Sequence, residues 1–320
     1  MARVWGLWGR WGRWSCRAAL AGAAALLVVR LAGLDAGSVL ASVVVFLPYA
    51  GVLAAVVLGT VLAVPALRAR GLAGVAGVVV VAYVVLLAPR FVADGREVPP
   101  GTPELRVATL NTDGSGADPR ALVDLVRRER IDVLAVEQLP ADGVAALERA
   151  GLGKLLPHQE LHPEYDSSLY SRLPLSRAGV TRIDTAWPQT TAEVTVGGRR
   201  IRLVAVHTYY PLGDPQRWTR DLEALAGLAG PDTVLLGDFN ASLDHTPMRA
   251  LLAAGLRDAH TELGHGWPRT WPADHPLLPP LLPLDHVLHG PGLAALDTAE
   301  HTVAGTGHRA VVVGLGVVEG

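Results

Sequence analysis

The segment Thr233-Val234-Leu235-Leu236-Gly237-Asp238-Phe239-Asn240 is an apolar run that ends in polar and turn-forming residues. Consecutive apolar and branched side chains bounded by a glycine are typical of a short buried strand. Taken alone, the Gly-Asp-Phe-Asn end favours an ordinary turn, because glycine, aspartate and asparagine are all turn formers. Its neighbours in the sequence change that interpretation.

The same arrangement recurs along residues 104–320, where apolar strand candidates end in polar side chains. Leu105 to Leu110 leads to Asn111, Ile131 to Val136 leads to Glu137, and Ile201 to Val206 leads to His207. A rigid sheet can hold such side chains from distant positions in one cleft. The full set comprises Asn111, Glu137, His207, Asp238, Asn240, Asp285 and His308. Strand candidates alternate with helical stretches, so we expect an α/β domain.

Composition divides the chain into two parts. Half of the 320 residues are hydrophobic and 18% are charged, and the apolar excess lies in the first 90 or so residues. The single cysteine, Cys16, excludes a disulfide framework and a cysteine-built metal site. Residues 104–320 carry 27 acidic and 19 basic residues. This balance disfavours nucleic acid as a partner, since sequence-independent binding of phosphates needs clustered lysine and arginine.

Three apolar stretches precede the acidic part, each near the ~20 residues that cross a bilayer. They are Ala18 to Leu34, Val39 to Leu62 and Leu72 to Ala88. A secretion signal would explain the first stretch but not the other two. Arginines before the first stretch, with Arg68 and Arg70 after the second, place the N-terminus in the cytoplasm by the positive-inside bias. Three crossings then predict a multi-pass protein of the cell membrane with an extracytoplasmic catalytic domain; the prediction inverts if the first stretch does not span.

We therefore predict a membrane domain over residues 1–97 with about three transmembrane helices, and a catalytic domain over 104–320. The proline-rich segment 98–103 between them is expected to be a stiff, extended linker, because each proline restricts its own φ and the residue before it.

Seven short motifs resemble those of the endonuclease/exonuclease/phosphatase superfamily, in the same order, over about residues 104–320. They are Leu110-Asn111, Val136-Glu137-Gln138, Ser171-Arg172-Leu173-Pro174-Leu175, Val206-His207, Gly237-Asp238-Phe239-Asn240, Leu284-Asp285-His286-Val287 and Gly307-His308-Arg309-Ala310-Val311. The resemblance implies a four-layer sandwich, in which two packed mixed β-sheets are flanked by helices. The membrane-tethered layout resembles the VanJ-like bacterial subgroup of that family.

A cation is expected at this site on chemical grounds as well. Glu137 and Asp238 in one cleft would repel each other unless a cation neutralised them, and Mg2+ characteristically uses one or two protein carboxylates. We predict Mg2+ or Mn2+, with Glu137 and Asp113 as metal ligands. The family usually has Ser-Asp-His before its last strand, whereas this chain has Thr306-Gly307-His308. Asp113 is expected to compensate in part for the aspartate missing at Gly307.

The remaining polar residues fit the steps of phosphoester hydrolysis. The resemblance implies that Asp285 orients His308, which would then act as general base towards water, with Asp238 as the alternative base. Asn111 and Asn240 can donate hydrogen bonds to phosphate oxygens, and His207 can stabilise or protonate the developing negative charge.

The expected function is a membrane-anchored, metal-dependent phosphoesterase that cleaves a phosphate ester or pyrophosphate. The apolar, proline-rich loop from Trp267 to Pro283 is either a rigid surface loop or a lip for a lipid-linked phosphate. The expected partners are the lipid bilayer and a small or lipid-linked phosphate. An extracytoplasmic nuclease and a non-catalytic binding protein that keeps the fold remain the alternatives.

Overall fold

The computed structural model describes residues 2–67 and 69–318, and the chain forms two compact units. The first unit comprises Met1–Pro89 with Asp244–Thr246, and the second comprises Arg90–Leu243 with Pro247–Gly320. The second unit therefore begins before the segment that the sequence analysis treats as a linker. Arg96, for example, donates to the carbonyl oxygens of Leu293 and Pro291, each at 3.0 Å.

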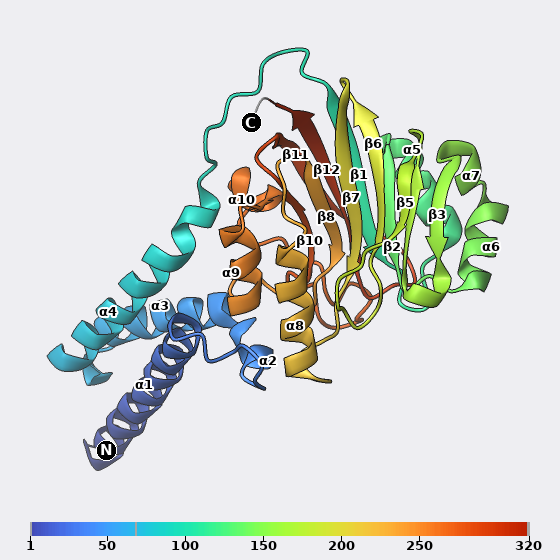
Figure 1. Cartoon of the computed structure of the whole chain (residues 1–320). Coiled ribbons are helices and arrows are strands. Elements are labelled where there is room, and N and C mark those ends of the chain that lie inside the picture. The colour runs from blue at the N-terminus through green and yellow to red at the C-terminus, as the bar shows by residue number, and fades with distance from the viewer. Residues whose placement is uncertain (1, 68, 319–320) are drawn as a thin grey trace. The chain divides into compact units, whose positions relative to one another are not determined.

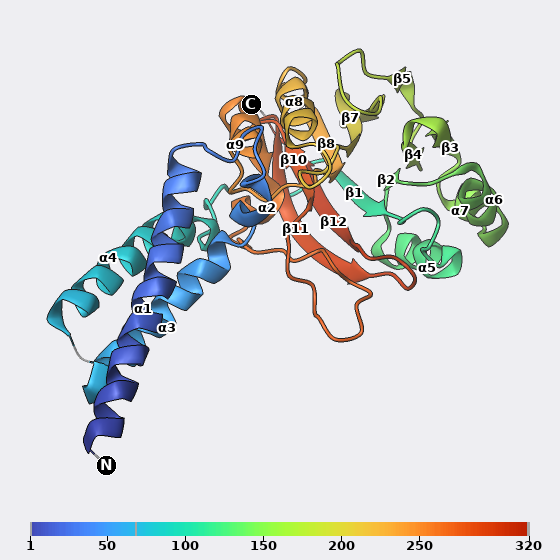
Figure 2. The same ribbon diagram turned by 90° about the horizontal axis from the view of Figure 1, so that it is seen from below.

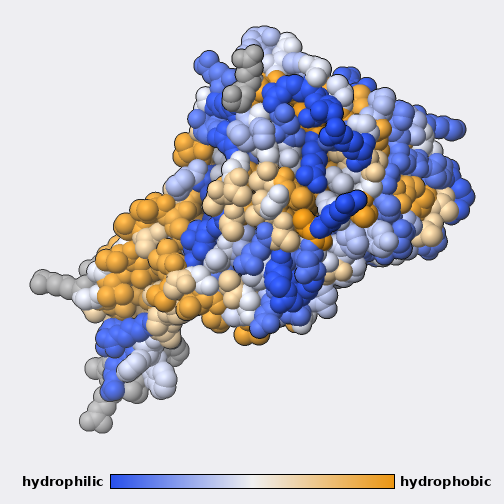
Figure 3. Space-filling view, viewed as in Figure 1, coloured by the Kyte–Doolittle hydropathy of each residue, from blue (hydrophilic) through white to orange (hydrophobic). Residues whose placement is uncertain are grey.

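The first unit is helical (Figure 1). Its helices are α1 (Ala2–Leu31), α2 (Ala41–Val44), α3 (Leu47–Ala63) and α4 (Arg70–Leu87), with 3-10 turns at Pro65–Leu67 and Ala88–Phe91. Side chains such as Leu27, Val57 and Tyr83 are buried among these helices. Other apolar side chains face outward, among them Val78 and Val85 of α4, and Figure 3 shows this apolar surface over α3 and α4.

Within the described residues, two helices rather than the expected three are long and apolar enough to cross a membrane. They cover Arg10–Leu31 and Gly71–Phe91. The stretch from Val39 to Leu62 is divided into α2 and α3, and Pro48 lies in the first turn of α3. At 17 residues, α3 is about 26 Å long, which is shorter than the hydrocarbon core of about 30 Å. Arg68, one of the arginines used to predict orientation, lies outside the described residues.

The second unit is built on two six-stranded mixed sheets, which confirms the expected pair of packed sheets. The first sheet has the order β11-β12-β1-β2-β4-β3 and the second has the order β5-β6-β7-β8-β10-β9. The first sheet contains β1 (Glu104–Asn111), β2 (Val133–Glu137), β3 (His158–His162), β4 (Ser167–Ser171), β11 (Leu293–Thr302) and β12 (Arg309–Val317). The second contains β5 (Ser176–Val180), β6 (Thr190–Val196), β7 (Arg199–His207), β8 (Thr233–Asp238), β9 (Arg257–Asp258) and β10 (Asp285–His289).

Helices cover both outer faces of the sheet pair (Figures 1 and 2). The helices beside the first sheet are α5 (Pro119–Glu129), α6 (Ala141–Ala150) and α7 (Leu152–Leu155). Those beside the second are α8 (Pro215–Ala226), α9 (Thr246–Ala253) and α10 (Ala259–Glu262). Asp118 caps α5 by accepting from the Arg120 amide, with Pro119 at the first helical position. The resulting order of helices, sheet, sheet and helices is the predicted four-layer sandwich.

The main core lies between the sheets and contains fully buried residues of both. Val107, Val133 and Val313 come from the first sheet, and Leu203 and Leu236 from the second. Burial of such side chains is worth about 1.5–3 kcal/mol each. A second core packs Leu110 and Leu134 of the first sheet against Leu122 and Leu125 of α5.

Each sheet contains one central pair of parallel strands, and the register of these pairs determines where the site lies. In the first sheet, β1 runs parallel to β2 with Asn111 opposite Glu137. In the second, β7 runs parallel to β8 with His207 opposite Asp238. Antiparallel β10 places Asp285 opposite Asp238 from the other side. Since parallel strands end at the same edge of a sheet, these side chains converge from both sheets.

Candidate functional site

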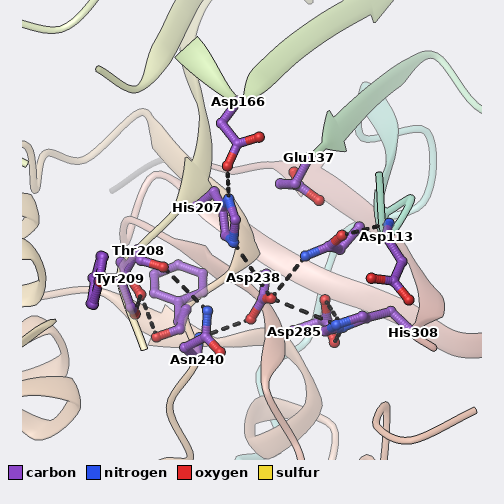
Figure 4. A network of polar contacts seen from close by, with 12 residues as sticks. Asp113, Glu137, Asp166, His207, Thr208, Tyr209, Asp238, Asn240, Asp285 and His308 are labelled. Atoms are coloured by element: carbon purple, nitrogen blue, oxygen red, sulfur yellow. Dashed lines mark hydrogen bonds and ion pairs between the residues drawn. The ribbon is translucent and has the colours of Figure 1, made fainter. Parts of the chain in front are cut away.

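All of the predicted catalytic residues lie around the ends of these parallel strands. Figure 4 shows the side chains of His207, Asp238, Asn240, Asp285 and His308 directed towards one another. Asn111 joins them from β1 by donating from Nδ2 to Asp238 Oδ2 at 3.0 Å. Asp113 is exposed beside this group, whereas Glu137 is completely buried.

Each residue of the Gly237-Asp238-Phe239-Asn240 segment has a different structural role. Gly237 has a φ of 152°, and a Cβ there would lie 1.9 Å from the carbonyl oxygen of Val206 on β7, so only glycine fits. Phe239 is buried in the core and meets His286 edge to face. Asn240 has a φ of 46°, a left-handed conformation that asparagine tolerates better than most residues. The segment is a strained turn that also places Asp238 and Asn240 in the candidate site.

Asp238 is the hub of the polar network. Its Oδ1 accepts from the backbone amide of Asn240 at 2.8 Å, while its Oδ2 accepts from Asn111. The Nε2 atoms of His207 and His308 lie 4.0 and 3.8 Å from Oδ2. Asn240 turns its own Nδ2 towards the carbonyl oxygen of Thr208 at 3.2 Å. Asp238 is thus held by two donors between two imidazoles.

His308 is oriented by Asp285, as the family resemblance implies. The Nδ1 atom of His308 lies 3.0 Å from Asp285 Oδ2 and 3.2 Å from Oδ1. Thr306 holds the preceding turn, since its hydroxyl donates to the carbonyl oxygen of Asn111 and accepts from the His308 amide. The turn before β12 is therefore tied directly to the end of β1.

The carboxyl of Glu137 lies in a negatively charged, dehydrated environment. Burial raises its pKa well above the ordinary value, and the charges of Asp285 and Asp238 raise it further. A hydrogen bond from Thr109, whose hydroxyl lies 3.0 and 3.1 Å from the two carboxylate oxygens, opposes this effect. The shift shows that Glu137 interacts electrostatically with the residues of the second sheet.

Asp238 and His308 are perturbed by the same concentration of carboxylates. Burial and the charge of Asp285 raise the pKa of Asp238, while His308 and His207 oppose the rise. Burial lowers the pKa of His308, but the carboxylates of Asp285, Asp238 and Glu137 more than offset it and raise this pKa to about 10. At neutral pH, without a bound cation, His308 is an imidazolium.

His207 is supported by residues that the sequence analysis does not identify. Asp166 Oδ2 lies 2.8 Å from His207 Nδ1, which leaves Nε2 to face Asp238. The side chain of Gln189 hydrogen-bonds to both backbone groups of His207. It accepts from the amide at 2.7 Å and donates to the carbonyl oxygen at 3.1 Å. The ring of Trp187 stacks on the imidazole with centroids 4.9 Å apart. None of these three residues ends an apolar strand, so no local signal marks them.

The site fits a hard divalent cation. Among the described residues, Asp238, Asp285 and His308 each offer a ligand atom within 4.8 Å of the other two, and all three are buried. With Glu137, three buried carboxylates face the His308 imidazolium, which leaves an excess of negative charge that a cation would neutralise. Such an oxygen-rich set suits Mg2+ or Mn2+.

Gly307, where the chain departs from the Ser-Asp-His pattern, has room for a Cβ. A Cβ at Gly307 would lie 3.7 Å from Asp113 Oδ2 and 3.5 Å from Asp274 Oδ1, which is ordinary van der Waals contact. Asp113, the predicted second ligand, therefore lies beside the position of the missing side chain. Asp274, which the sequence analysis does not single out, approaches the same position from the loop before β10.

Comparisons with known proteins agree with this architecture. D. rerio TDP2 complexed with a single-strand DNA product is similar in structure, with a TM-score of 0.55 and 18% identity over 66% of this chain and 98% of that one. Truncated Caenorhabditis elegans TDP2 has a TM-score of 0.52 and 13% identity over 67% and 98%. An endonuclease/exonuclease/phosphatase from Beutenbergia cavernae has a TM-score of 0.51 and 17% identity over 68% and 72%.

A comparison with curated proteins finds no match. The sequence model of one family matches residues 108–306, which is more than half of the chain. This match contains Asn111, Glu137, His207, Asp238 and Asp285, and ends two residues before His308. The chain belongs to the endonuclease/exonuclease/phosphatase family.

Proposed function

We propose that this protein is a membrane-anchored, divalent-metal-dependent phosphoesterase that cleaves a phosphate ester or pyrophosphate, on a lipid-linked substrate outside the cytoplasmic membrane. Enzymes of the family hydrolyse phosphoesters and use divalent metals. The observation that carries the proposal is the convergence of Asp238, Asp285 and His308 within 4.8 Å. Asp238 ends parallel strand β8, Asp285 begins antiparallel β10 and His308 precedes antiparallel β12.

Proton transfer in this proposal begins at Asp238. Both ring nitrogens of His308 face carboxylates, which raise its pKa to about 10 before a cation binds and so favour the protonated ring. His308 therefore donates to a phosphoryl oxygen, while Asp238 accepts the proton of the attacking water. This assignment reverses the preference for His308 as general base that the family resemblance suggests.

The neutral side chains and His207 act on the phosphate and the leaving group. Asn111 and Asn240 donate to phosphate oxygens from either side of Asp238. Asp166 holds the Nδ1 proton of His207, so the Nε2 atom is directed into the site, where it protonates the leaving oxygen when the imidazole is charged.

Glu137 and Asp113 are the residues that we propose to hold the cation, next to the cluster of Asp238, Asp285 and His308. When bound, a divalent ion polarises a phosphoryl oxygen and offsets the charge that grows in the transition state. Glu137 is well suited because its position among other buried carboxylates disfavours its charged form in the absence of a cation.

The membrane location rests on the two candidate spans, α1 and α4, and an extracytoplasmic catalytic unit further requires the 17-residue α3 to cross the membrane. The test is labelling with a membrane-impermeant maleimide of a Cys16→Ser, Arg200→Cys variant, since Arg200 is exposed in the catalytic unit. Labelling of intact cells supports an extracytoplasmic site. Labelling only after permeabilisation contradicts it.

The activity is tested with full-length protein in detergent or vesicles, with and without Mg2+. Phosphate release is measured from lipid pyrophosphates and soluble esters, and strand cleavage is measured on plasmid DNA. We expect metal-dependent release from the lipid substrate and its loss in Asp238→Asn, while Asp124→Asn on the exposed face of α5 retains activity. Degradation of DNA in place of lipid hydrolysis would establish the nuclease alternative. No turnover of any substrate, with no effect of Asp238→Asn, would establish a non-catalytic protein.

A further inference from the structure

Beyond Phe91 and Val92, the exposed large apolar side chains of the catalytic unit gather in a few loops. Among the described residues from Glu104 onward, the exposed large hydrophobic side chains are Tyr165, Tyr210, Leu212, Trp271, Leu277 and Leu278. All six lie in loops that lead to the active-site residues, and we call this set the apolar rim. Exposed apolar residues that gather around a functional opening indicate a surface that something covers.

The rim is joined to the site by direct contacts. Tyr165 precedes Asp166, the partner of His207. Tyr210 stacks on Tyr209 with ring centroids 4.8 Å apart, Tyr209 stacks on Trp187 at 5.5 Å, and Trp187 stacks on His207. A continuous series of rings therefore runs from the active site to the exposed side chain of Tyr210.

Three residues of the rim lie in the loop Trp271–Pro283, and this loop is also held against the site by direct contacts. The Nε1 atom of Trp271 lies 3.6 Å from the position that a Cβ of Gly307 would occupy, and the amide of Ala273 donates to the Gly307 carbonyl oxygen at 2.7 Å. Asp274 directs its carboxylate towards Gly307, that is, towards the site. Whatever covers the rim thus lies at the entrance used by the substrate.

The tip of this loop presents leucines to solvent in a fixed conformation. Leu277 is 86% exposed and Leu278 is 47% exposed. The Nδ1 atom of His275 accepts hydrogen bonds from the backbone amides of both leucines, at 3.1 and 3.0 Å. These hydrogen bonds fix the turn in the conformation that exposes both leucine side chains.

The hydrogen bonding of the loop Trp271–Pro283 favours a lipid surface over a protein as the partner of the rim. Five of its thirteen residues are prolines, which lack an amide hydrogen. Six of the other eight amides donate within the chain, to Leu282, Gly307, His275 and Trp271. A loop with its donors removed or paired enters a lipid interface at low cost, because hydrocarbon offers no hydrogen-bond acceptors. The same property leaves few donors for pairing with another protein backbone.

We propose that the apolar rim is a docking surface for a lipid bilayer, with Leu212, Leu277 and Leu278 inserted at the boundary of headgroups and acyl chains and the aromatic rings at headgroup level. The candidate spans α1 and α4 keep the chain at a membrane, and the rim directs the active site towards it. The consequence for substrate rests on the proposed function: the site receives phosphates at the level of lipid headgroups.

Docking is measured independently of catalysis in full-length protein reconstituted into phosphatidylcholine/phosphatidylglycerol vesicles. A fluorophore is attached at Leu277→Cys in a Cys16→Ser background, and the matched control carries it at Arg200→Cys. Arg200 lies at the end of β7 opposite His207 and is exposed. We expect nitroxide-labelled lipid to quench the label at 277 at least about twofold more than the label at 200, with iodide showing the reverse order. A label at 277 that iodide reaches freely, or that neither reagent reaches because protein covers it, overturns the docking surface.

A second measurement separates docking from hydrolysis. The Leu277→Asp, Leu278→Asp variant is expected to lose at least about tenfold in hydrolysis of a vesicle-borne phosphate and to retain hydrolysis of p-nitrophenyl phosphate. Thr195→Asp, at the exposed position of β6 opposite Arg200, is expected to change neither. Equal rates on the vesicle substrate for this variant and the parent protein contradict the docking surface. Lipid quenching without turnover of any phosphoester would support docking while refuting the proposed hydrolase.

Discussion

The Asp285→Asn substitution tests whether the buried carboxylates control the protonation of His308. Asparagine has nearly the same shape as aspartate, and the contact of Asp285 with His308 Nδ1 at 3.0 Å is kept as a neutral hydrogen bond. What is lost is one negative charge beside the imidazole. The pKa of His308 is therefore expected to fall.

The size of the fall follows from the environment of His308. Its pKa of about 10 lies about 3.5 pH units above the ordinary histidine value of 6.5, which corresponds to about 5 kcal/mol in favour of the charged ring. Asp285 is the strongest of the three carboxylates that raise it, and acts both by charge and by hydrogen bond. An equal share would already be about 1.2 units, so we expect a decrease of more than about one unit, or about 1.5 kcal/mol.

The assay is an NMR titration of protein labelled at histidine Cε1, in detergent with a chelator, with His308→Gln to assign the signal. Asp124→Asn is the control, because this exposed carboxylate of α5 pairs with Arg127 and not with a histidine. A change of less than about 0.3 units in folded Asp285→Asn would refute the assignment of Asp285 as the group that holds the His308 proton.

Three further predictions concern the metal, the strand and the second histidine. Because burial raises the pKa of Glu137 and Asp238, their contribution to stability is present below the unfolded pKa values and lost as pH rises through the folded ones. Mg2+ should therefore release protons on binding, by calorimetry in two buffers, and raise Tm more at about pH 8 than at about pH 5. Gly237→Ala places a methyl group 1.9 Å from a backbone oxygen of β7 and should cost more than about 3 kcal/mol in denaturant unfolding. Asp166→Asn removes the anionic partner of His207 Nδ1 and should lower kcat about tenfold or more.

Each of these predictions has a control within the chain. Gly255→Ala also has a positive φ, 100°, but meets no atom within 4 Å, so it should cost only the strain of about 1–2 kcal/mol. Equal costs for Gly237→Ala and Gly255→Ala would show that close approach to β7 is not the cause. An Asp166→Asn protein with an unchanged kcat would show that the contact of Asp166 with His207 does not support catalysis. Metal binding without proton release would mean that Glu137 and Asp238 are already ionised.

Much of the site was predictable because its residues end buried strands. A run of apolar residues followed by Asn111, Glu137, His207 or Asp238 marks each strand end in the sequence, and parallel neighbours end at a common edge. The Gly-Asp-Phe-Asn segment was informative because every position is constrained, from the close approach at Gly237 to the left-handed Asn240. Local patterning together with the family's motif order was sufficient to predict two packed sheets and the residues between them.

The supporting residues could not be predicted in this way, because their role depends on contacts far apart in the sequence. Asp166 reaches His207 across 41 positions, and Gln189 reaches the same residue from a different loop. Their own neighbours carry no strand or helix signal that would mark them. The predicted number of membrane crossings was wrong for a related reason. Hydropathy counted Val39 to Leu62 as one stretch, although the helix is interrupted before Pro48.

By itself, then, the sequence determined the strands, the chemistry at their ends and the apolar N-terminal segment, because these depend on composition and on neighbours along the chain. Only the tertiary structure decided which charges face each other, and so that His308 holds its proton between Asp285 and Asp238. It also brought Tyr210 and Leu277 to the border of one site from separate loops. Packing determines such relations, since electrostatic and apolar contacts depend on distance in space rather than on distance along the chain.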